Sequence, residues 1–155
     1  MASDLLIRPA QLSDAYELAR TIRPADRVEV LSLTGGSTLQ ALLATLSTGD
    51  EAFTALRAGK VVGVWGCGRA CLMDPTGVPW LLTSRYAEDR PRELMEVSRN
   101  TVDLWREEYP LLRSYVDARY VRAQRWLKWL GFTLLPAVPM GPFGYPFHPF
   151  ELRGV

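Results

Sequence analysis

The stretch VDARYVRAQRWLKWLGF, residues 116–132, decides the fold of this chain. A strand runs into Val116, and a helix is predicted from about Val121 to Leu130. The apolar stripe of that helix recurs at helical spacing and consists of Ala123, Trp126, Leu127 and Leu130. Gly131 ends the helix, because glycine adopts the left-handed conformation of a C-terminal cap without a steric penalty. The stretch therefore predicts a strand–helix–strand unit late in the chain.

The N-terminal part predicts one strand followed by two or three helices. LLIRPA (5–10) is a short apolar run closed by proline, as in a strand. Ser13 is placed to cap the first helix, and ADRVEVLSL (25–33) predicts a second short helix. Ser37 and Gln40 have the spacing of a capping box for a third.

The middle of the chain predicts three antiparallel strands. The runs EAFTALR (51–57) and VVGVWGCGRA (61–70) flank Ala58-Gly59, which is typical of a hairpin turn. DPTG (74–77) predicts the next turn, with proline in its second place and glycine in its fourth. VPWLLTS (78–84) then supplies the third strand.

The C-terminal part adds a long helix and further strands. Pro91 suits the first turn of the helix, and LLRSYVDA (111–118) is a strand of mixed polarity. FTLLPAV (132–138) predicts one more strand, and HPFELR (148–153) predicts a final edge strand because it contains proline. The order predicts an α+β fold, with a twisted mixed sheet of about seven strands and helices on both faces, in one domain over residues 1–155.

Composition excludes several classes of function. The net charge of +1 gives no electrostatic reason to expect nucleic acid or a membrane surface as partner. Apolar runs fall far short of the roughly 20 residues that a membrane-spanning helix needs. Cys67 and Cys71 would stand about 13 Å apart in an extended segment, too far for a disulfide. Two cysteines and one histidine also make a poor ligand set, so no metal is predicted.

The order of elements resembles that of the GNAT superfamily of N-acetyltransferases. Val116, Ala123 and Gly131-Phe132 stand at the spacing of that family's strand, helix and closing Gly-Phe, and the opening IRPA…SDA is similar to the family's first strand and helix. GVPWLLTS, YVDARY…RWLKWLGF and GPFGYPFHPFE resemble, more narrowly, GNAT-like proteins of short-tailed bacteriophages. Some of those are described as internal-virion or assembly-related proteins and others as acetyltransferases.

The resemblance implies an acetyl-CoA or CoA site in a cleft between the fourth and fifth strands, with PWLLTS (79–84) and SYVDARY (114–120) as its walls. In the family a glycine-rich turn before a helix holds the pyrophosphate on backbone amides. Here that turn is TSRYAEDRPRELM (83–95), which contains no glycine and carries Glu88 and Asp89, which would repel phosphate. Arginine side chains are the candidates to replace the glycine-rich backbone; the alternative, which we favour, is a charged surface loop with local pairs of arginine and glutamate. The predicted cofactor-binding residues are Leu82, Thr83, Arg85, Arg90, Arg92, Tyr120 and Ala123.

Catalytic residues are harder to assign from the resemblance. Tyr120 stands where the family usually has asparagine, and Leu127 stands where many members have the tyrosine that protonates the leaving thiolate; leucine has no proton to give. The remaining candidates for acid or base are Tyr120, Glu51 and His148. For Tyr120 we expect a half-buried ring with its hydroxyl at the surface. His148 lies between prolines, where a structural role is the expectation.

Two functions from different classes follow. The glycine-free turn and Leu127 favour a binding or virion-associated module with a degenerate acyl-CoA site, acting on host or phage proteins in the host cytoplasm or packaged in the virion. An aromatic tail (Phe143, Tyr145, Phe147 and Phe150) and a basic helix (Arg119, Arg122, Arg125 and Lys128) would provide its contact surfaces. For these two segments the alternatives are an aromatic flap that closes the core and a solvated helix face. The alternative function is that of an active acetyl-CoA-dependent N-acetyltransferase that modifies an amine.

Overall fold

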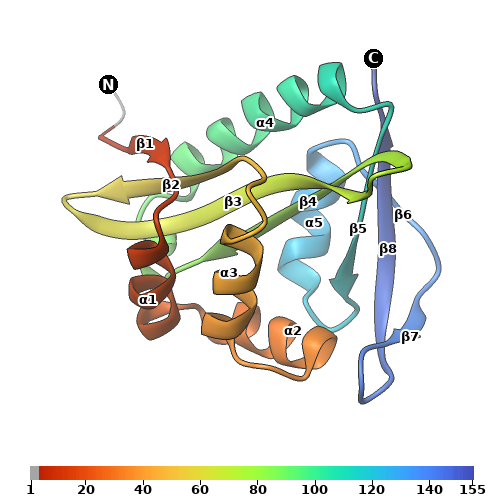
Figure 1. The fold of residues 1–155 in the computed structure, drawn as a ribbon, viewed down its shortest axis with the longest axis horizontal. Helices are drawn as coiled ribbons and strands as arrows, with labels where there is room; N and C mark the ends of the chain where they lie inside the picture. The colour runs from red at the N-terminus through yellow and green to blue at the C-terminus, as the bar shows by residue number, and fades with distance from the viewer. Residues whose placement is uncertain (1–3) are drawn as a thin grey trace.

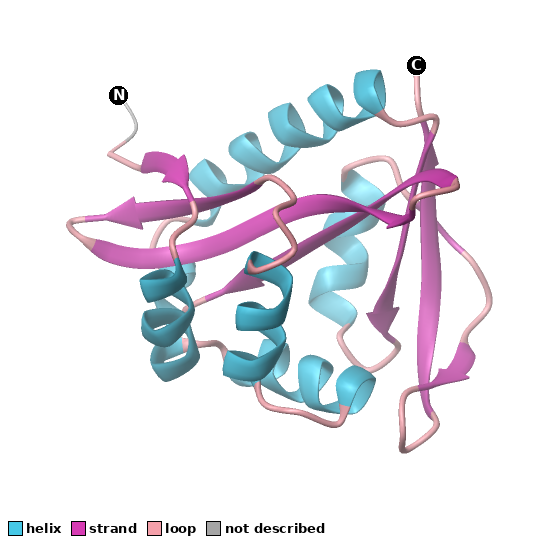
Figure 2. Ribbon diagram, viewed as in Figure 1, coloured by secondary structure: helices cyan, strands magenta, loops and turns pink. Residues whose placement is uncertain are grey.

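The computed structural model describes residues 4–155, which form an α+β domain around a mixed sheet (Figures 1 and 2). The strands are β1 (Leu6–Pro9), β2 (Ala52–Arg57), β3 (Lys60–Cys71), β4 (Asp74–Thr83), β5 (Leu111–Asp117), β6 (Thr133–Leu134), β7 (Val138–Met140) and β8 (Tyr145–Arg153). The helices are α1 (Leu12–Thr21), α2 (Pro24–Thr34), α3 (Thr38–Leu46), the short 3₁₀ helix η1 (Arg85–Glu88), α4 (Pro91–Glu108) and α5 (Val121–Trp129).

β1 pairs antiparallel with β2, and β2, β3 and β4 form the predicted antiparallel meander. Its first hairpin turns at Ala58 (φ 51°) and Gly59 (φ 75°), and two successive positive φ angles match the twist of the flanking strands. The second hairpin is different from the prediction. Cys71 pairs with Asp74, so the turn is Leu72-Met73 and the DPTG segment belongs to β4. Asp74 does form a local turn contact with the Thr76 amide, but strand pairing continues through it.

The second half of the sheet runs in the order β4-β5-β8-β6, with β7 also paired to β8. β8 is therefore an interior strand, and the prediction of an edge strand was wrong. Pro149 is tolerated because of its orientation: its carbonyl accepts from Leu135 N on the side away from β5, so its missing N–H is not needed by β5. Pro146 lies beyond the last residue of β8 that pairs with β5, Phe147. The segment predicted as one strand, 132–138, is divided into β6 and β7 around Pro136, which gives eight strands among the described residues.

Helices cover both faces of the sheet, as predicted. α1 and α3 pack on one face through Ala15, Leu18 and Leu42. α4 and α5 pack on the other through Val102 and Leu127. α2 lies beyond the ends of β4 and β5 (Figure 1). Within residues 4–155, no helix has the length and apolar character needed to cross a membrane.

Two helix starts test the capping predictions. The Ser37–Gln40 capping box is confirmed, with each side chain accepting from the other residue's amide. Ser13 does not cap α1, which begins at Leu12 with Gln11 as its N-cap residue. Asp14 sets that start: its carboxylate is held by Arg8 and Thr54 and accepts the amide of Gln11, the N-cap residue. A buried ion pair thus overrides the local serine signal.

The sheet divides between β4 and β5. These parallel strands share one paired position among the described residues, Gly77 with Leu112. A Cβ at Gly77 would lie 2.7 Å from the Tyr109 ring and 2.9 Å from both Cys67 Sγ and Leu112 Cδ2, so only glycine permits this close approach. Beyond this point β4 and β5 separate (Figure 1).

The aromatic tail belongs largely to the core, which corrects the prediction of a contact surface. Phe147 is fully buried, whereas Phe143 at the β7–β8 turn is 59% exposed. We expect Phe147→Ala to cost about 3–5 kcal/mol of unfolding free energy through lost burial and a cavity. Phe143→Ala, the matched control, should change it by less than about 0.5 kcal/mol. Urea denaturation measures both; equal effects of the two substitutions would contradict the burial of Phe147.

Candidate functional site

The separation of β4 from β5 opens a cleft of about 590 Å³. Its walls are β4 and β5, with α2 and α3 on one side of the sheet and α4 and α5 on the other. Most of the lining side chains are apolar; polar ones come from α4, β5 and α5, and one group of them lies near α2. This group includes Arg23, Asp26, Glu29, Thr83 and Tyr120. An apolar cleft with a few converging polar groups has the character of a small-molecule site.

Every second residue of β4 points its backbone N–H and C=O groups toward the cleft. Ser84 N donates to Val62 O of β3 at 2.9 Å. Because neighbouring residues of a strand point their amides to opposite edges, Leu82 also faces β3, while Leu81 and Thr83 face the cleft. Leu82, predicted to bind a cofactor through its backbone, therefore contributes only its side chain to the cleft.

β5 presents its backbone to the cleft in the same alternating way. Ala118 N donates to Pro146 O, at the β8 edge, at 3.0 Å. The adjacent Asp117 and, two residues before it, Tyr115 consequently direct their amides and carbonyls toward β4. Leu81 and Tyr115 are therefore cleft-facing backbone positions on opposite walls, each two residues inside the end of its strand.

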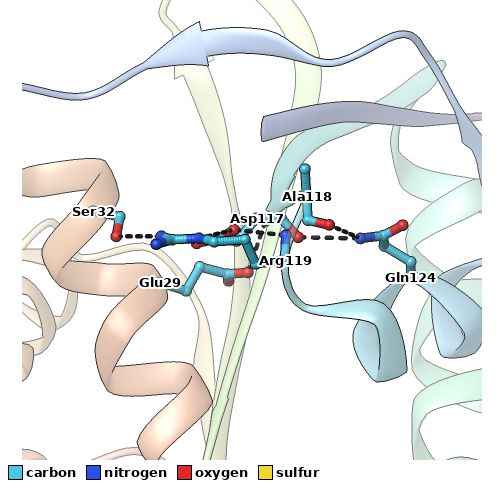
Figure 3. Close-up of polar contacts among 6 residues, drawn as sticks. All are labelled: Glu29, Ser32, Asp117, Ala118, Arg119 and Gln124. Carbon is cyan, nitrogen blue, oxygen red and sulfur yellow. Dashed lines mark hydrogen bonds and ion pairs between the residues drawn. The ribbon is translucent and has the colours of Figure 1, made fainter. Parts of the chain in front are cut away.

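α2 is hydrogen-bonded to both walls at the end of the cleft. On β4, Asp26 Oδ2 accepts from Thr83 N at 2.8 Å and from Thr83 Oγ1 at 2.7 Å. On β5, Glu29 Oε2 accepts from Asp117 N at 3.0 Å (Figure 3). Asp26 and Glu29 are one helical turn apart, so they reach the two strands from one face of α2.

The turn after β5 adds a third contact with α2. Arg119 Nη2 donates to Ser32 Oγ at 2.9 Å and to Asp117 Oδ2 at 2.7 Å (Figure 3). Burial by itself would raise the pKa of Asp117, but its hydrogen bonds with Arg119 outweigh burial and hold that pKa below its usual value. Gln124 donates to the carbonyls of Asp117 and Ala118, which fixes the turn into α5.

Glu29 has the properties of a general base. Burial raises its pKa from 4.5 to about 7, the negative charges of Asp26 and Asp117 act in the same direction, and the Asp117 amide opposes them. A carboxylate that titrates near neutral pH is matched to proton transfer under physiological conditions. Oε2 is held by the Asp117 amide, and no residue of the described chain bonds Oε1.

The hydroxyl of Tyr120 lies inside the cleft, not at the surface as expected. Arg23 Nη2 donates to Tyr120 Oη at 2.6 Å. Burial raises the pKa of Tyr120, and the charge of Asp26 and a hydrogen bond to it add to the effect, against the opposing charge of Arg23. The phenol therefore stays protonated at neutral pH and helps to hold Arg23 and Asp26 at the end of the cleft.

The turn between β4 and α4 does not present its arginines to the cleft. Arg85 lies against the Tyr86 ring, and Arg90 forms ion pairs with Asp4 and Glu93. Neither these two nor Arg92 line the cleft. The first turn of α4 carries Pro91, which has no N–H, and the acidic Glu93. Both features weaken it as an anion site.

Of the remaining predicted site residues, one lines the cleft and two do not. Ala123 lines the cleft as predicted, but Glu51 and His148 do not. His148 Nδ1 lies 2.9 Å from Leu135 O, beside a separate depression. Leu127 is buried in the core. Trp126 lines the cleft, and its indole N–H is shielded from solvent without an acceptor among the described residues.

Sequence reasoning missed Asp26 and Glu29, the acidic pair of α2. The available signal was the spacing i, i+3, i+6 of Asp26, Glu29 and Ser32, which places three polar residues on one face of a short helix. That pattern is common on solvent-exposed helices. Only the position of β5, about 90 residues later, shows that this face is turned inward.

Solved structures of acetyltransferases share this fold over nearly the whole chain. The GNAT-family acetyltransferase from Streptococcus pneumoniae is 15% identical, with a TM-score of 0.65 over 96% of this chain and 99% of that one. Ard1 from Thermoplasma volcanium is 17% identical, with a TM-score of 0.75 over 99% of both chains. The acetyltransferase yncA from Salmonella typhimurium, solved with its cofactor acetyl-CoA, is 16% identical, with a TM-score of 0.69 over 97% of this chain and 94% of that one.

These identities are low, so the likeness establishes the fold. No protein-family model and no curated protein matches the sequence. The chain therefore has the GNAT fold, with its cleft at the separation of β4 and β5. No group of three or more His, Cys, Asp or Glu residues able to hold a metal ion occurs within residues 4–155.

The raised pKa of Glu29 predicts a pH-dependent stability. Between the ordinary value of 4.5 and the folded value of about 7, the folded state holds more protons than the unfolded state. Unfolding free energy therefore falls as pH rises through this window, by up to about 1.4 kcal/mol per pH unit. Glu29→Gln keeps an acceptor for the Asp117 amide but removes the charge. It should therefore abolish the part of the pH-dependent loss of unfolding free energy that comes from Glu29.

The measurement is the free energy of unfolding from urea titrations at pH 5, 6, 7 and 8. The wild-type protein should lose stability relative to Glu29→Gln across this series. Glu96→Gln, at an exposed position of α4, is the matched control and should follow the wild type. If Glu29→Gln also followed the wild type, Glu29 would have an ordinary pKa.

Proposed function

We propose that the protein is an acyl-CoA-dependent N-acyltransferase that transfers an acetyl group from acetyl-CoA to an amine. The observation that carries this proposal is the Glu29 carboxylate, with its pKa raised to about 7, at the inner end of an apolar cleft between two strand edges. The GNAT fold of the chain agrees with it. This reverses the preference that the glycine-free turn and Leu127 suggested from sequence.

The donor fits the cleft through its pantetheine arm. Leu81 and Tyr115 offer cleft-facing amides and carbonyls on opposite walls, and an extended arm with two amide groups can pair with such edges as an added strand does. Trp126 offers a further donor, because its buried indole N–H has no partner in the protein. Thr83 is excluded from this role, since Asp26 and Arg23 N already bind its cleft-facing groups.

The acceptor fits the α2 side of the cleft. A protonated amine is attracted to Glu29, which takes one proton to give the neutral nucleophile. The C–N bond then forms as the C–S bond of the thioester breaks, and the second N–H proton is released as the thiolate is protonated. General base catalysis of this kind contributes about 10²–10⁴ in rate, and holding both substrates in the cleft contributes through orientation.

The chemistry does not require a general acid at Leu127. A thiol has a pKa of about 8.5, so a thiolate is a stable leaving group near neutral pH. Tyr120 is a positioning residue in this scheme: its raised pKa and its hydrogen bonds to Arg23 and Asp26 make it a poor proton donor. Its part is to keep Asp26 on Thr83 and so to keep the end of the cleft in place.

The binding-module function has less support. It relied on exposed aromatics in the tail, and Phe147 and Phe150 are buried. Only Phe143 and Tyr145 remain exposed, and Tyr145 stacks with Arg119. The resemblance of GVPWLLTS and GPFGYPFHPFE to phage proteins supports a finer proposal, in which the acceptor amine belongs to a host or phage molecule in the host cytoplasm.

The proposal predicts saturable binding of acetyl-CoA, measured by calorimetry and by melting curves. Ligand at a hundred times its dissociation constant should add about 2.7 kcal/mol to the stability of the folded protein. Absence of binding at millimolar acetyl-CoA would contradict the proposal.

Acyl transfer should depend on Glu29. With a panel of primary amines and peptides, and thiol release as the readout, Glu29→Gln should lose about 10²–10⁴ of the rate while keeping its affinity for acetyl-CoA. Glu96→Gln is the control and should transfer normally. In the wild type the rate should rise with pH to a plateau, with a midpoint near 7. A Glu29→Gln protein with full activity would remove Glu29 from the mechanism.

A further inference from the structure

The anion-binding turn usual for this fold is compromised here, so the phosphates of the donor need another site. In the turn between β4 and α4, Arg90 is paired with Asp4 and Glu93, and Arg57 forms ion pairs with the same two carboxylates. At the first turn of α4, the acidic Glu93 would repel an incoming anion, and Pro91 has no N–H to donate to it. A phosphate there would compete with existing ion pairs.

α5 offers two arginines that line the cleft and have no partner. Arg122 and Arg125 are both exposed cleft-lining residues, and neither forms an ion pair or hydrogen bond within the described chain. They are three residues apart, which places them on the same side of the helix, about 5–6 Å apart at Cβ. That spacing allows two guanidinium groups to hold one phosphate group or two neighbouring ones.

The charge of α5 has no structural explanation. The helix carries Arg122, Arg125 and Lys128 and no acidic residue. Arg122 lies in its first turn, at the positive end of the helix dipole, where a cation is unfavourable. No described side chain offsets this cost, and a bound anion would.

A second observation points to the same side of the cleft. Trp126 follows Arg125 directly, and its indole N–H is buried without an acceptor. An orphaned donor of this kind costs stability unless something accepts from it. A carbonyl of a ligand in the cleft, one turn from Arg122, would be such an acceptor.

We infer that α5 is the site for the phosphate and pantetheine of the acyl donor: Arg122 and Arg125 bind the phosphates, and Trp126 Nε1 donates to an amide carbonyl of the arm. This inference rests on the proposed function. It assigns the anion site to a different helix from the α4 N-terminus that the resemblance implies. The ligand chemistry is a phosphorylated pantetheine thioester.

The test compares two ligands by calorimetry, acetyl-CoA and S-acetyl-pantetheine, which lacks every phosphate. The double variant Arg122→Gln/Arg125→Gln should bind acetyl-CoA at least about tenfold more weakly and bind S-acetyl-pantetheine as the wild type does. Raising the salt concentration should reduce the difference in acetyl-CoA affinity between the wild type and the double variant. The free variant should be slightly more stable than the wild type, since a cation leaves the first turn of α5.

The matched control is Arg20→Gln/Arg69→Gln, which removes two exposed arginines that do not line the cleft. It should leave the affinity for acetyl-CoA within about twofold, because distant surface charges are screened. Trp126→Phe keeps an aromatic ring but removes the N–H, so it should weaken both ligands several-fold and equally. Unchanged affinity of Trp126→Phe for both ligands would remove Trp126 from the site.

Arg92→Gln tests whether the phosphates bind at the N-terminus of α4 or at α5. If it weakens acetyl-CoA as much as the α5 double variant does, the phosphates lie at α4 and the inference is overturned. An α5 double variant that binds acetyl-CoA like the wild type overturns it as well, while the proposed function stands. If the wild-type protein binds neither ligand at millimolar concentration, the proposed function fails and the inference fails with it.

Discussion

Two hydrogen-bonded carboxylates keep the sheet open at a defined width. β4 and β5 pair at Gly77 and Leu112 and then separate, which leaves the cleft-facing amides of Thr83 and Asp117 without a neighbouring strand. Buried amides without acceptors would be costly. Asp26 and Glu29 satisfy them from one face of α2. The cleft therefore persists because a helix, not another strand, bonds the two separated ends.

This constraint explains why the acidic pair contains the residue that we propose as the general base. A carboxylate that must accept a backbone amide in a buried place is desolvated, and desolvation raises its pKa. Asp26 lies 3.8 Å from Arg23 and accepts from the Thr83 hydroxyl. Glu29 accepts from the Asp117 amide alone among the described residues, and burial raises its pKa to about 7. The contact that closes the end of the cleft therefore also places the carboxylate that we propose as the base.

Much of the fold was predictable from local sequence signals, and the misses have a common cause. The Ala58-Gly59 hairpin, the Ser37–Gln40 capping box and the helix ended by Gly131 depend on neighbouring residues and were predicted. The start of α1 and the interior position of β8 depend on residues far along the chain. Asp14 is held by Thr54, and Pro149 of β8 is acceptable only because of how β5 and Leu135 lie beside it.

The candidate site was less predictable for the same reason. Tyr120, Thr83 and Ala123 were taken from the resemblance and line the cleft, although the backbone groups of Thr83 are bound within the protein. Glu29 was missed because its burial depends on a strand that lies about 90 residues away. The arginines were sought in the turn before α4, where the resemblance implies an anion site, and ion pairs of that turn with Asp4 and Glu93 were invisible in the sequence.

Places where a folded chain departs from local stability rules are where function is expected. This structure has three such places around one cleft: a half-buried carboxylate with a raised pKa, an indole N–H without an acceptor among the described residues, and α5, whose charged residues are all cations and include an arginine in the first turn. Each costs stability in the free protein. The three requirements, a proton donor for the base, a carbonyl for the indole and an anion for the arginines, are met together by an amine and a phosphorylated thioester. A surface that binds only another protein would leave the first two unmet, since both lie inside the cleft.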